Sequence, residues 1–123
     1  MAHLILASSS PRRRELLAQL GLTFDIESPD IDESVFKDES ASVYVERLAR
    51  VKAEAVQQHF PDAIVIAADT SLGLDGKILG KPESKQHAFE MWAQLSGRKH
   101  DVFSGVCVLT KDQICSIVVR TQV

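Results

Sequence analysis

The sequence predicts an α/β domain in which a mixed, twisted sheet is flanked by helices. Three observations lead to this prediction. Short apolar runs alternate with longer segments whose apolar residues recur every three to four positions, as strands and helices do when they alternate along a chain. The dipeptide Asp75-Gly76 stands between two such runs and indicates an antiparallel hairpin. Two stretches at about 101–109 and 114–123, joined around Lys111-Asp112, predict a closing pair of strands, and the second is rich in β-branched residues.

The N-terminal part predicts a strand followed at once by a helix. Leu4–Ala7 has the composition of a short buried strand. Ser10 before Pro11 is a typical helix start, because a serine hydroxyl caps a free N–H and proline fits the first helical position. We expect the helix to run to Leu20, where Gly21 ends it. One apolar face of this helix is formed by Leu16, Leu17 and Leu20.

A second strand and a longer helix follow, separated by a polar loop. Residues 23–27 alternate between apolar and polar side chains, as a strand does, and residues 28–40 are acidic and polar. A helix is predicted from about Ala41, with Pro61 beyond its end. Its apolar stripe has the helical spacing i, i+4, i+7 and i+11, at Tyr44, Leu48, Val51 and Ala55.

The second half of the chain predicts the centre of the sheet. Ala63–Ala68 is a continuous apolar run, which is typical of a central strand buried on both faces, and we expect Asp69-Thr70 to close it. The hairpin follows, with strands at 71–74 and 77–79. The helix predicted next begins at Ser84, ends at Gly97 and carries the apolar residues Ala88, Met91, Trp92 and Leu95.

Composition and motifs exclude several classes of protein. The 123 residues suffice for a single domain over 1–123, with 45% hydrophobic and 25% charged residues, and the net charge of −3 argues against a general affinity for nucleic acid or an anionic membrane. No apolar run approaches the ~20 residues of a membrane span, and the N-terminus lacks a secretory signal, so we expect a cytoplasmic protein. The sequence motifs of P-loop, dinucleotide-binding, zinc and serine-hydrolase sites are absent, and two cysteines make no disulfide framework.

The first segment with chemical potential is Ser8-Ser9-Ser10-Pro11-Arg12-Arg13-Arg14, between a strand and a helix. A helix N-terminus offers free N–H groups and a positive dipole, which suit a phosphate, and hydroxyl and guanidinium groups add directed contacts. Three consecutive arginines there oppose the helix dipole. They therefore favour an anionic ligand over the alternative of a solvated basic turn.

Two acidic segments are candidates for holding a metal ion or acting as a base. Asp30-Ile31-Asp32-Glu33 clusters carboxylates whose repulsion a divalent cation would relieve, although a solvated loop is the commoner outcome. Asp69-Thr70 would stand at the carboxyl end of a central strand, where α/β sheets place their ligands, and partial desolvation makes a carboxylate more basic. The alternative is an ordinary turn residue.

Two lysines complete the polar candidates. Lys81 lies between Gly80 and Pro82 after the predicted hairpin, and Lys52 lies on the long helix, facing either a cleft or water. Together with the arginines and carboxylates, they form the set that metal-assisted phosphoryl chemistry uses. In such chemistry cations hold the phosphates, while carboxylates hold Mg²⁺ and activate water.

At these segments the sequence resembles the Maf family of nucleoside triphosphate pyrophosphatases. Each match is weak alone, but the matches come in order and span nearly the whole chain, which makes the set highly specific. They are Ala7-Ser8-Ser9-Ser10-Pro11-Arg12-Arg13 with Glu15-Leu16-Leu17, Ser28-Pro29 through Ile31-Asp32-Glu33, Leu48-Ala49-Arg50 through Lys52-Ala53, Ala68-Asp69-Thr70, Leu74 through Pro82, and Leu95-Ser96-Gly97-Arg98 with His100.

The resemblance implies an α/β fold with a cleft between two lobes, related to inosine triphosphate pyrophosphatases, and cleavage between the α and β phosphates with Mg²⁺ or Mn²⁺. It makes Asp69 the proton acceptor and, with Glu33, a metal ligand. Contacts to the phosphates fall to Ser8, Arg13, Lys52 and Lys81. Arg12 and Thr70 stand where the family discriminates its substrates. With Arg and Thr there, the chain resembles the branch that cleaves dTTP and UTP, whereas the branch acting on 7-methyl-GTP has Trp and Gln.

One departure from the family concerns the C-terminus. Family members continue past the position of Val123 through a segment of the type Asp-Lys-Ala-Gly-Ala-Tyr-Gly-Ile-Gln, which supplies further sheet and a glutamine that determines specificity. The resemblance therefore implies a fold that is incomplete at the C-terminus, with lower stability and slow turnover. An apolar edge strand at 114–123 would be a template for pairing with another chain, so a homodimer is an alternative to a monomer.

Two functions from different classes are compatible with these residues. The first is an enzyme that cleaves dTTP and UTP, and modified pyrimidine nucleotides, to the monophosphate and pyrophosphate. Its partner is a small nucleoside triphosphate rather than nucleic acid or a membrane. The second is a non-catalytic nucleotide-binding or cell-division regulatory protein, or an inactive fragment. Release of pyrophosphate in the presence of Mg²⁺ distinguishes the two.

Overall fold

The computed structural model describes residues 3–8, 10–74, 77–79, 86 and 101–122. The elements follow in the order β1 (Leu4–Ala7), α1 (Pro11–Gln19), β2 (Asp25–Glu27), α2 (Ala41–Gln57), β3 (Ile64–Leu74), β4 (Lys77–Leu79), β5 (Asp101–Leu109) and β6 (Ile114–Gln122). This is the mixed α/β architecture that the sequence predicts. Among the helices described, none is long and apolar enough to cross a membrane.

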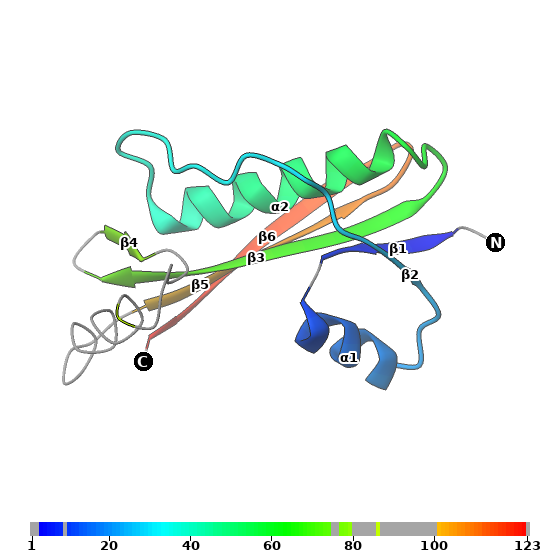
Figure 1. Ribbon diagram of the computed structural model, residues 1–123, viewed down its shortest axis with the longest axis horizontal. Coiled ribbons are helices and arrows are strands. Elements are labelled where there is room, and N and C mark those ends of the chain that lie inside the picture. The colour runs from blue at the N-terminus through cyan, green and yellow to red at the C-terminus, as the bar shows by residue number, and fades with distance from the viewer. Residues whose placement is uncertain (1–2, 9, 75–76, 80–85, 87–100, 123) are drawn as a thin grey trace.

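The strands form one mixed sheet in the order β2-β1-β3-β5-β6, with β4 paired to β3 (Figure 1). β1 is parallel to both β2 and β3, whereas β5 and β6 continue the sheet in an antiparallel manner. The chain leaves β1 outward to β2 and then returns past β1 to β3. Because crossovers between parallel strands are right-handed, these two connections of opposite sense place α1 and α2 on opposite sides of the sheet, as Figure 1 shows.

The longer helix, α2, packs on β3 and β5 and builds the core with them. Its buried residues are Ala41, Tyr44, Val45, Leu48, Ala49, Ala53 and Val56. The predicted apolar stripe is therefore right at Tyr44 and Leu48 but wrong at Val51 and Ala55, which are only half-buried. The small side chains Ala49 and Ala53 occupy the face nearest the sheet, and their modest hydrophobicity gives a weak signal in the sequence.

A glycine sets how closely α2 approaches the sheet. A Cβ atom on Gly105 of β5 would lie 2.5 Å from the carbonyl oxygen of Val45 in α2. Only glycine lets two backbones come this close without displacing one of them. Gly105 pairs in register with Asp69 of β3, so the helix lies nearest the sheet beside that residue.

The shorter helix, α1, has the predicted ends. The Oγ of Ser10 accepts the N–H of Arg13 at 3.4 Å, Pro11 is the first helical residue, and Gly21 adopts a positive φ of 78° just beyond the end. The expected apolar face is not packed, however. No residue of α1 is buried, and Leu20 is 73% exposed. Leucine spacing alone does not show whether another element covers a helix face.

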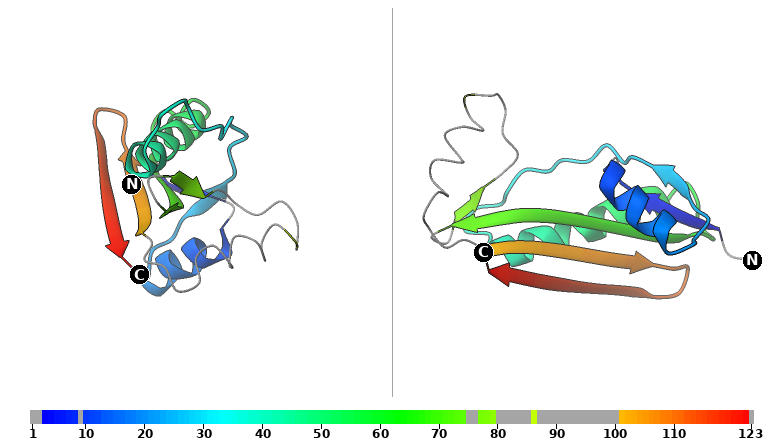
Figure 2. Two further views of the ribbon diagram at one scale, coloured as in Figure 1. Left: turned by 90° about the vertical axis from the view of Figure 1, so that its left-hand side faces the viewer. Right: turned by 90° about the horizontal axis from the view of Figure 1, so that it is seen from below.

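The central strand, β3, differs most from expectation. The predicted strands at 63–68 and 71–74 are one continuous strand, so Asp69 and Thr70 lie inside it rather than at its end. Side chains on one face, among them Val65 and Ala67, are buried, whereas Ile64 and Ile66 on the other face are half-buried, because α2 covers a single face. β1 pairs with β3 only as far as Ala67, and β3 continues beside β5 beyond that point (Figure 2).

The remaining elements agree with the sequence where the structure describes them. Lys77 of β4 lies opposite Leu74 of β3, as the predicted hairpin requires. β5 has the predicted bounds, and β6 ends at Gln122. The turn signal Asp75-Gly76, the candidate Lys81 and, apart from Gln86, the helix expected from Ser84 to Gly97 lie outside the described residues.

Candidate functional site

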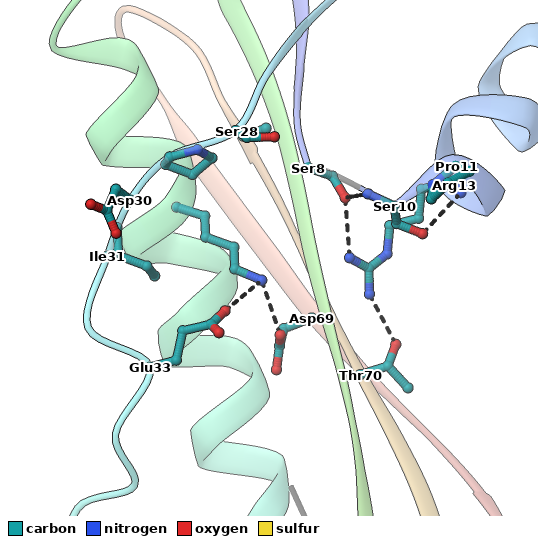
Figure 3. Close-up of a pocket in the computed structure, with 13 residues that line it drawn as sticks. Ser8, Ser10, Pro11, Arg13, Ser28, Asp30, Ile31, Glu33, Asp69 and Thr70 are labelled. Carbon is teal, nitrogen blue, oxygen red and sulfur yellow. Dashed lines mark hydrogen bonds and ion pairs between the residues drawn. The ribbon is translucent and has the colours of Figure 1, made fainter. Parts of the chain in front are cut away.

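A cleft opens where β1 ends and β3 continues. It encloses about 520 Å³ and lies at the carboxyl end of β1, beside β3. The connection that leaves β1 and the connection that enters β3 lie on opposite sides of the sheet. This is the position at which α/β sheets place their ligands. The side chains that line it come from the start of α1, the loop after β2, α2 and the middle of β3 (Figure 3): Ala7, Ser8, Ser10, Pro11, Arg13, Ser28, Pro29, Asp30, Ile31, Glu33, Lys52, Asp69 and Thr70.

One wall of the cleft carries hydroxyl and guanidinium groups. The buried Ser8 Oγ accepts two hydrogen bonds, from the backbone N–H of Ser10 at 3.1 Å and from Nη1 of Arg13 at 3.3 Å. Nη2 of Arg13 donates to Oγ1 of Thr70 at 3.3 Å, which ties α1 to β3. A serine oxygen that already accepts two bonds has its own O–H left to donate. This wall therefore offers donors to an anion, at the N-terminus of a helix.

The opposite wall carries two carboxylates joined by one ammonium group. Nζ of Lys52 lies 3.0 Å from Oδ1 of Asp69 and 3.4 Å from Oε1 of Glu33. The side chains of Lys52 and Asp69 are 12% and 9% exposed, whereas that of Glu33 is 45% exposed and reaches the solvent. Three groups that are distant in the sequence thus meet at one position, with one positive and two negative charges.

The hydroxyl of Tyr44 lies beside the carboxylate wall of the cleft. Its hydroxyl donates to the backbone carbonyl of Glu33 at 2.5 Å. Burial raises the pKa of Tyr44 above its ordinary value, and the charges on Asp69 and Glu33 raise it further, because a phenolate is disfavoured beside carboxylates. The phenol of Tyr44 therefore keeps its proton near neutral pH and can donate it to the carbonyl of Glu33.

The structure brings together most of the residues that the sequence singles out. Ser8, Arg13, Glu33, Lys52, Asp69 and Thr70 all line the cleft. Arg12 does not line it and is exposed on α1. This separation follows from the helix, because consecutive helical residues point about 100° apart, so Arg12 and Arg13 point in different directions.

The acidic segment 30–33 divides between the cleft and the solvent. Asp30 and Glu33 line the cleft, whereas Asp32 accepts hydrogen bonds from the backbone N–H and the hydroxyl of Ser34, at 2.9 and 2.6 Å. These bonds lower the pKa of Asp32 and use its oxygens in a local turn. Across the described residues no three His, Cys, Asp or Glu side chains form a metal-binding cluster. The four-residue acidic segment is therefore not a complete metal site by itself.

Two polar contacts of the site are not predicted by the sequence. The hydroxyl of Tyr44 supports Glu33, and Ser104 of β5 lies 3.2 Å, Oγ to Oγ1, from Thr70. In the sequence, Tyr44 belongs to the predicted apolar stripe of the helix, which gives no indication that its hydroxyl bonds to Glu33. The contact of Ser104 with Thr70 depends on the register of β3 with β5. The contact between Ser104 and Thr70 could have been predicted only if the pairing of these two strands had been known.

Comparison with known proteins gives consistent matches. The model of the family described as Maf-like protein matches residues 3–123. A dTTP/UTP pyrophosphatase of Acinetobacter baylyi is 64% identical over 118 residues, which are 96% of this chain and 64% of that protein. A dTTP/UTP pyrophosphatase of Myxococcus xanthus is 49% identical over 120 residues, which are 98% of this chain and 61% of that protein. The chain thus spans less than two thirds of the length of these relatives.

A solved structure shows the same fold at low sequence identity. The nucleoside-triphosphatase, or dITP/XTP pyrophosphatase, of Mycobacterium abscessus superposes with a TM-score of 0.61 at 19% identity. The match covers 98% of this chain and 72% of that one. It confirms the predicted relation in fold.

Proposed function

The chain belongs to the Maf-like protein family, and from this premise we propose that it hydrolyses dTTP and UTP to the nucleoside monophosphate and pyrophosphate. The observation that carries the proposal is the cleft in which the Ser8–Arg13–Thr70 wall faces the Glu33–Lys52–Asp69 wall. One wall suits the phosphates of a nucleotide, and the other suits a cation and an activated water. The names of the similar proteins from Acinetobacter and Myxococcus support the choice of substrates.

The phosphates would bind along the first wall. Ser8 donates its hydroxyl, Arg13 offers its remaining N–H groups, and the free N–H groups at the start of α1 add their dipole. Lys52 reaches the same space from α2, and we include Lys81 on the basis of the family resemblance. We assign base selection to Thr70 and to Arg12, the exposed residue at the start of the same helix.

Asp69 is the proposed proton acceptor. Its side chain is almost buried on the wall opposite the phosphate donors, and Lys52 holds Oδ1, so we assign Oδ2 to the attacking water. In the proposed reaction the water oxygen bonds to the α phosphorus while its proton passes to Asp69. The bond from the α phosphorus to the bridging oxygen breaks, and pyrophosphate leaves with that oxygen.

The second wall fits a divalent metal ion. The carboxylates of Glu33 and Asp69 converge on the ammonium group of Lys52, which supports a cation position between them. Carboxylate oxygens are hard donors of the kind that Mg²⁺ and Mn²⁺ take, and Mg²⁺ usually combines one or two carboxylates with waters and substrate phosphates. A bound metal ion would supply neutralisation of phosphate charge and polarisation of the bond to be broken. We therefore propose Glu33 and Asp69 as its protein ligands.

The compartment and the oligomeric state complete the proposal. We propose a cytoplasmic protein, because the proposed nucleoside triphosphate substrates are made and used in that compartment. β6 is the outer strand of the described sheet order and exposes Ile117 and Val119, so we propose a homodimer that associates through this strand. Sedimentation over a range of protein concentrations tests the homodimer.

The function is tested by measuring pyrophosphate release from a panel of nucleoside triphosphates with Mg²⁺ or Mn²⁺. We expect release from dTTP and UTP in the wild-type chain and its loss in Asp69→Asn. Saturable binding of dTTP without release of pyrophosphate would contradict the enzyme and favour a nucleotide-binding protein. Release of inorganic phosphate instead would show that a different bond is cleaved.

A further inference from the structure

The segment between Glu33 and Ser40, here called the strap, lies beside α2 and carries one residue of the cleft (Figure 1). Glu33 begins the strap and lines the cleft, and Ser40 ends it by capping α2. Apolar burial contributes little to holding the strap, because Val35 and Phe36 are 49% and 59% exposed. Its polar contacts with α2 are therefore what fixes it.

Arg47 of α2 makes three of these hydrogen bonds, more than any other residue of the helix. Its Nε and Nη2 donate to the two carboxylate oxygens of Glu39, at 2.7 and 2.9 Å, and Nη2 also donates to the carbonyl of Ser34 at 2.8 Å. The guanidinium lies 3.8 Å from the ring centre of Phe36, in a cation–π contact. The Glu39 side chain is only 5% exposed, and its hydrogen bonds from Arg47 lower its pKa. A paired, bidentate charge of this kind fixes geometry as well as adding energy.

The helix holds the start of the strap at two consecutive carbonyl groups. Tyr44 donates to the carbonyl of Glu33, and Arg47 donates to the carbonyl of Ser34. Two turns beyond Tyr44, Lys52 meets the carboxylate of Glu33. One helix therefore fixes both the backbone of Glu33 and the cation that its carboxylate faces.

We propose that Arg47, anchored by Glu39, is a positioning residue that holds the Glu33 carboxylate where it binds the metal ion of the substrate complex. The inference rests on the proposed function, since the metal role of Glu33 belongs to it. Arg47 does not line the cleft. It acts through the strap, as the outer hydrogen-bond partners of metal ligands do in other proteins.

The test measures metal binding rather than turnover. Mn²⁺ is titrated by electron paramagnetic resonance in the presence of α,β-methylene-dTTP, which has no α–β bridging oxygen and is not cleaved there. Arg47→Met keeps the apolar stem and removes the guanidinium, and we expect about tenfold weaker Mn²⁺ binding. Arg50→Met, at an exposed position on the same helix, is the matched control and should bind Mn²⁺ as the wild type does.

A second variant separates positioning from general loss of the fold. Tyr44→Phe deletes only the hydroxyl that holds Glu33, keeps the buried ring, and should weaken Mn²⁺ binding in the same direction by a smaller factor. Wild-type Mn²⁺ affinity in folded Arg47→Met would overturn the proposal, and so would a wild-type chain that holds no Mn²⁺ beside the nucleotide. Pyrophosphate release by the wild type is a separate readout. If release fails while Mn²⁺ binding depends on Arg47, the reaction is wrong and the positioning role stands.

Discussion

Lys52 of α2 and Asp69 of β3 form an ion pair with 3.0 Å between Nζ and Oδ1, at the point where β3 extends past the end of β1. The pair joins the helix to the sheet inside the cleft, and Glu33 shares the same ammonium group at 3.4 Å. In the proposed function a divalent cation would bind between the two carboxylates that this ammonium now joins.

Asp69→Asn tests the assignment of the proton acceptor. The variant should lower turnover of dTTP by about 10²–10⁴-fold, because an amide cannot take a proton from water. Nucleotide binding should persist, since the amide is isosteric and removes a negative charge near the phosphates. Pyrophosphate release and equilibrium binding of dTTP are measured side by side. Near-normal turnover would show that another group accepts the proton.

Lys52→Met should affect metal and nucleotide in opposite directions. Without nucleotide, Mn²⁺ should bind at least about tenfold more tightly than to the wild type, because the ammonium no longer competes for the two carboxylates. The KM for dTTP should rise, because a cation for the phosphates is lost. The control is Lys111→Met, whose exposed ammonium pairs with Asp62. Unchanged Mn²⁺ affinity in Lys52→Met would mean that Lys52 and the metal do not share a position.

Arg12 and Thr70 should favour pyrimidine over purine substrates. We expect kcat/KM for dTTP and UTP to exceed the values for ATP, GTP and 7-methyl-GTP, because donors and acceptors left unpaired by the wrong base give large discrimination. Thr70→Val keeps the shape of the side chain and removes its hydrogen bonds with Arg13 and Ser104. It should therefore reduce the ratio of kcat/KM for pyrimidine substrates to kcat/KM for purine substrates. A purine triphosphate that is turned over faster than both pyrimidines would refute this assignment.

The Arg47–Glu39 pair should make stability depend on pH in the acid range. The pKa of Glu39 is lowered by its hydrogen bonds from Arg47, so the folded state binds a proton less readily than the unfolded chain does. The stabilisation is present above the ordinary glutamate pKa and is lost as the pH falls through the lowered value. Glu39→Gln should reduce the free energy of unfolding by about 1 kcal/mol at pH 7 and by little near pH 3.

Urea unfolding of the wild type and Glu39→Gln between pH 3 and 7 measures this difference. Glu54→Gln, at an exposed position on α2, is the control for loss of a surface charge. If the difference in the free energy of unfolding between wild type and Glu39→Gln stays constant across the pH range, ionisation of Glu39 is not the cause of the stabilisation.

Local signals in the sequence predict much of the fold. Ser10 with Pro11 fixes the start of α1, Gly21 follows its end, and the β-branched stretches give β5 and β6. The features that the sequence does not predict are those that depend on contacts between elements distant in the chain. β3 passes through Asp69 without a break because β5 pairs with it along its whole length after Ile64, and pairing of this kind leaves no local trace.

The candidate site divides in the same way. Sequence patterns single out the segment from Ser8 to Arg14, the acidic segment 30–33, Asp69 and Lys52 as candidates. The choice of Arg13 among the three arginines, and the grouping of all these residues into one site, come from the family resemblance. The side chains that line the cleft meet there because the strap and α2 take particular positions against the sheet, and those positions are set by tertiary contacts. Arg12 illustrates the limit, because a motif that includes three arginines does not say which of them faces the cleft. The chemical roles of all these residues stay predictions.

Gly105 has a consequence for how variation in this protein should be interpreted. It lies opposite Asp69 in the sheet and lets the backbone of α2, which carries Lys52, sit at its present depth. A methyl group there would push the helix outward and lengthen the Lys52–Asp69 contact, although Gly105 itself lines no part of the cleft. A mutational screen that scores only nucleotide-contacting positions would rate this glycine as neutral. Selection on the proposed activity would nevertheless remove its variants, because Gly105 sets how closely α2 approaches the sheet.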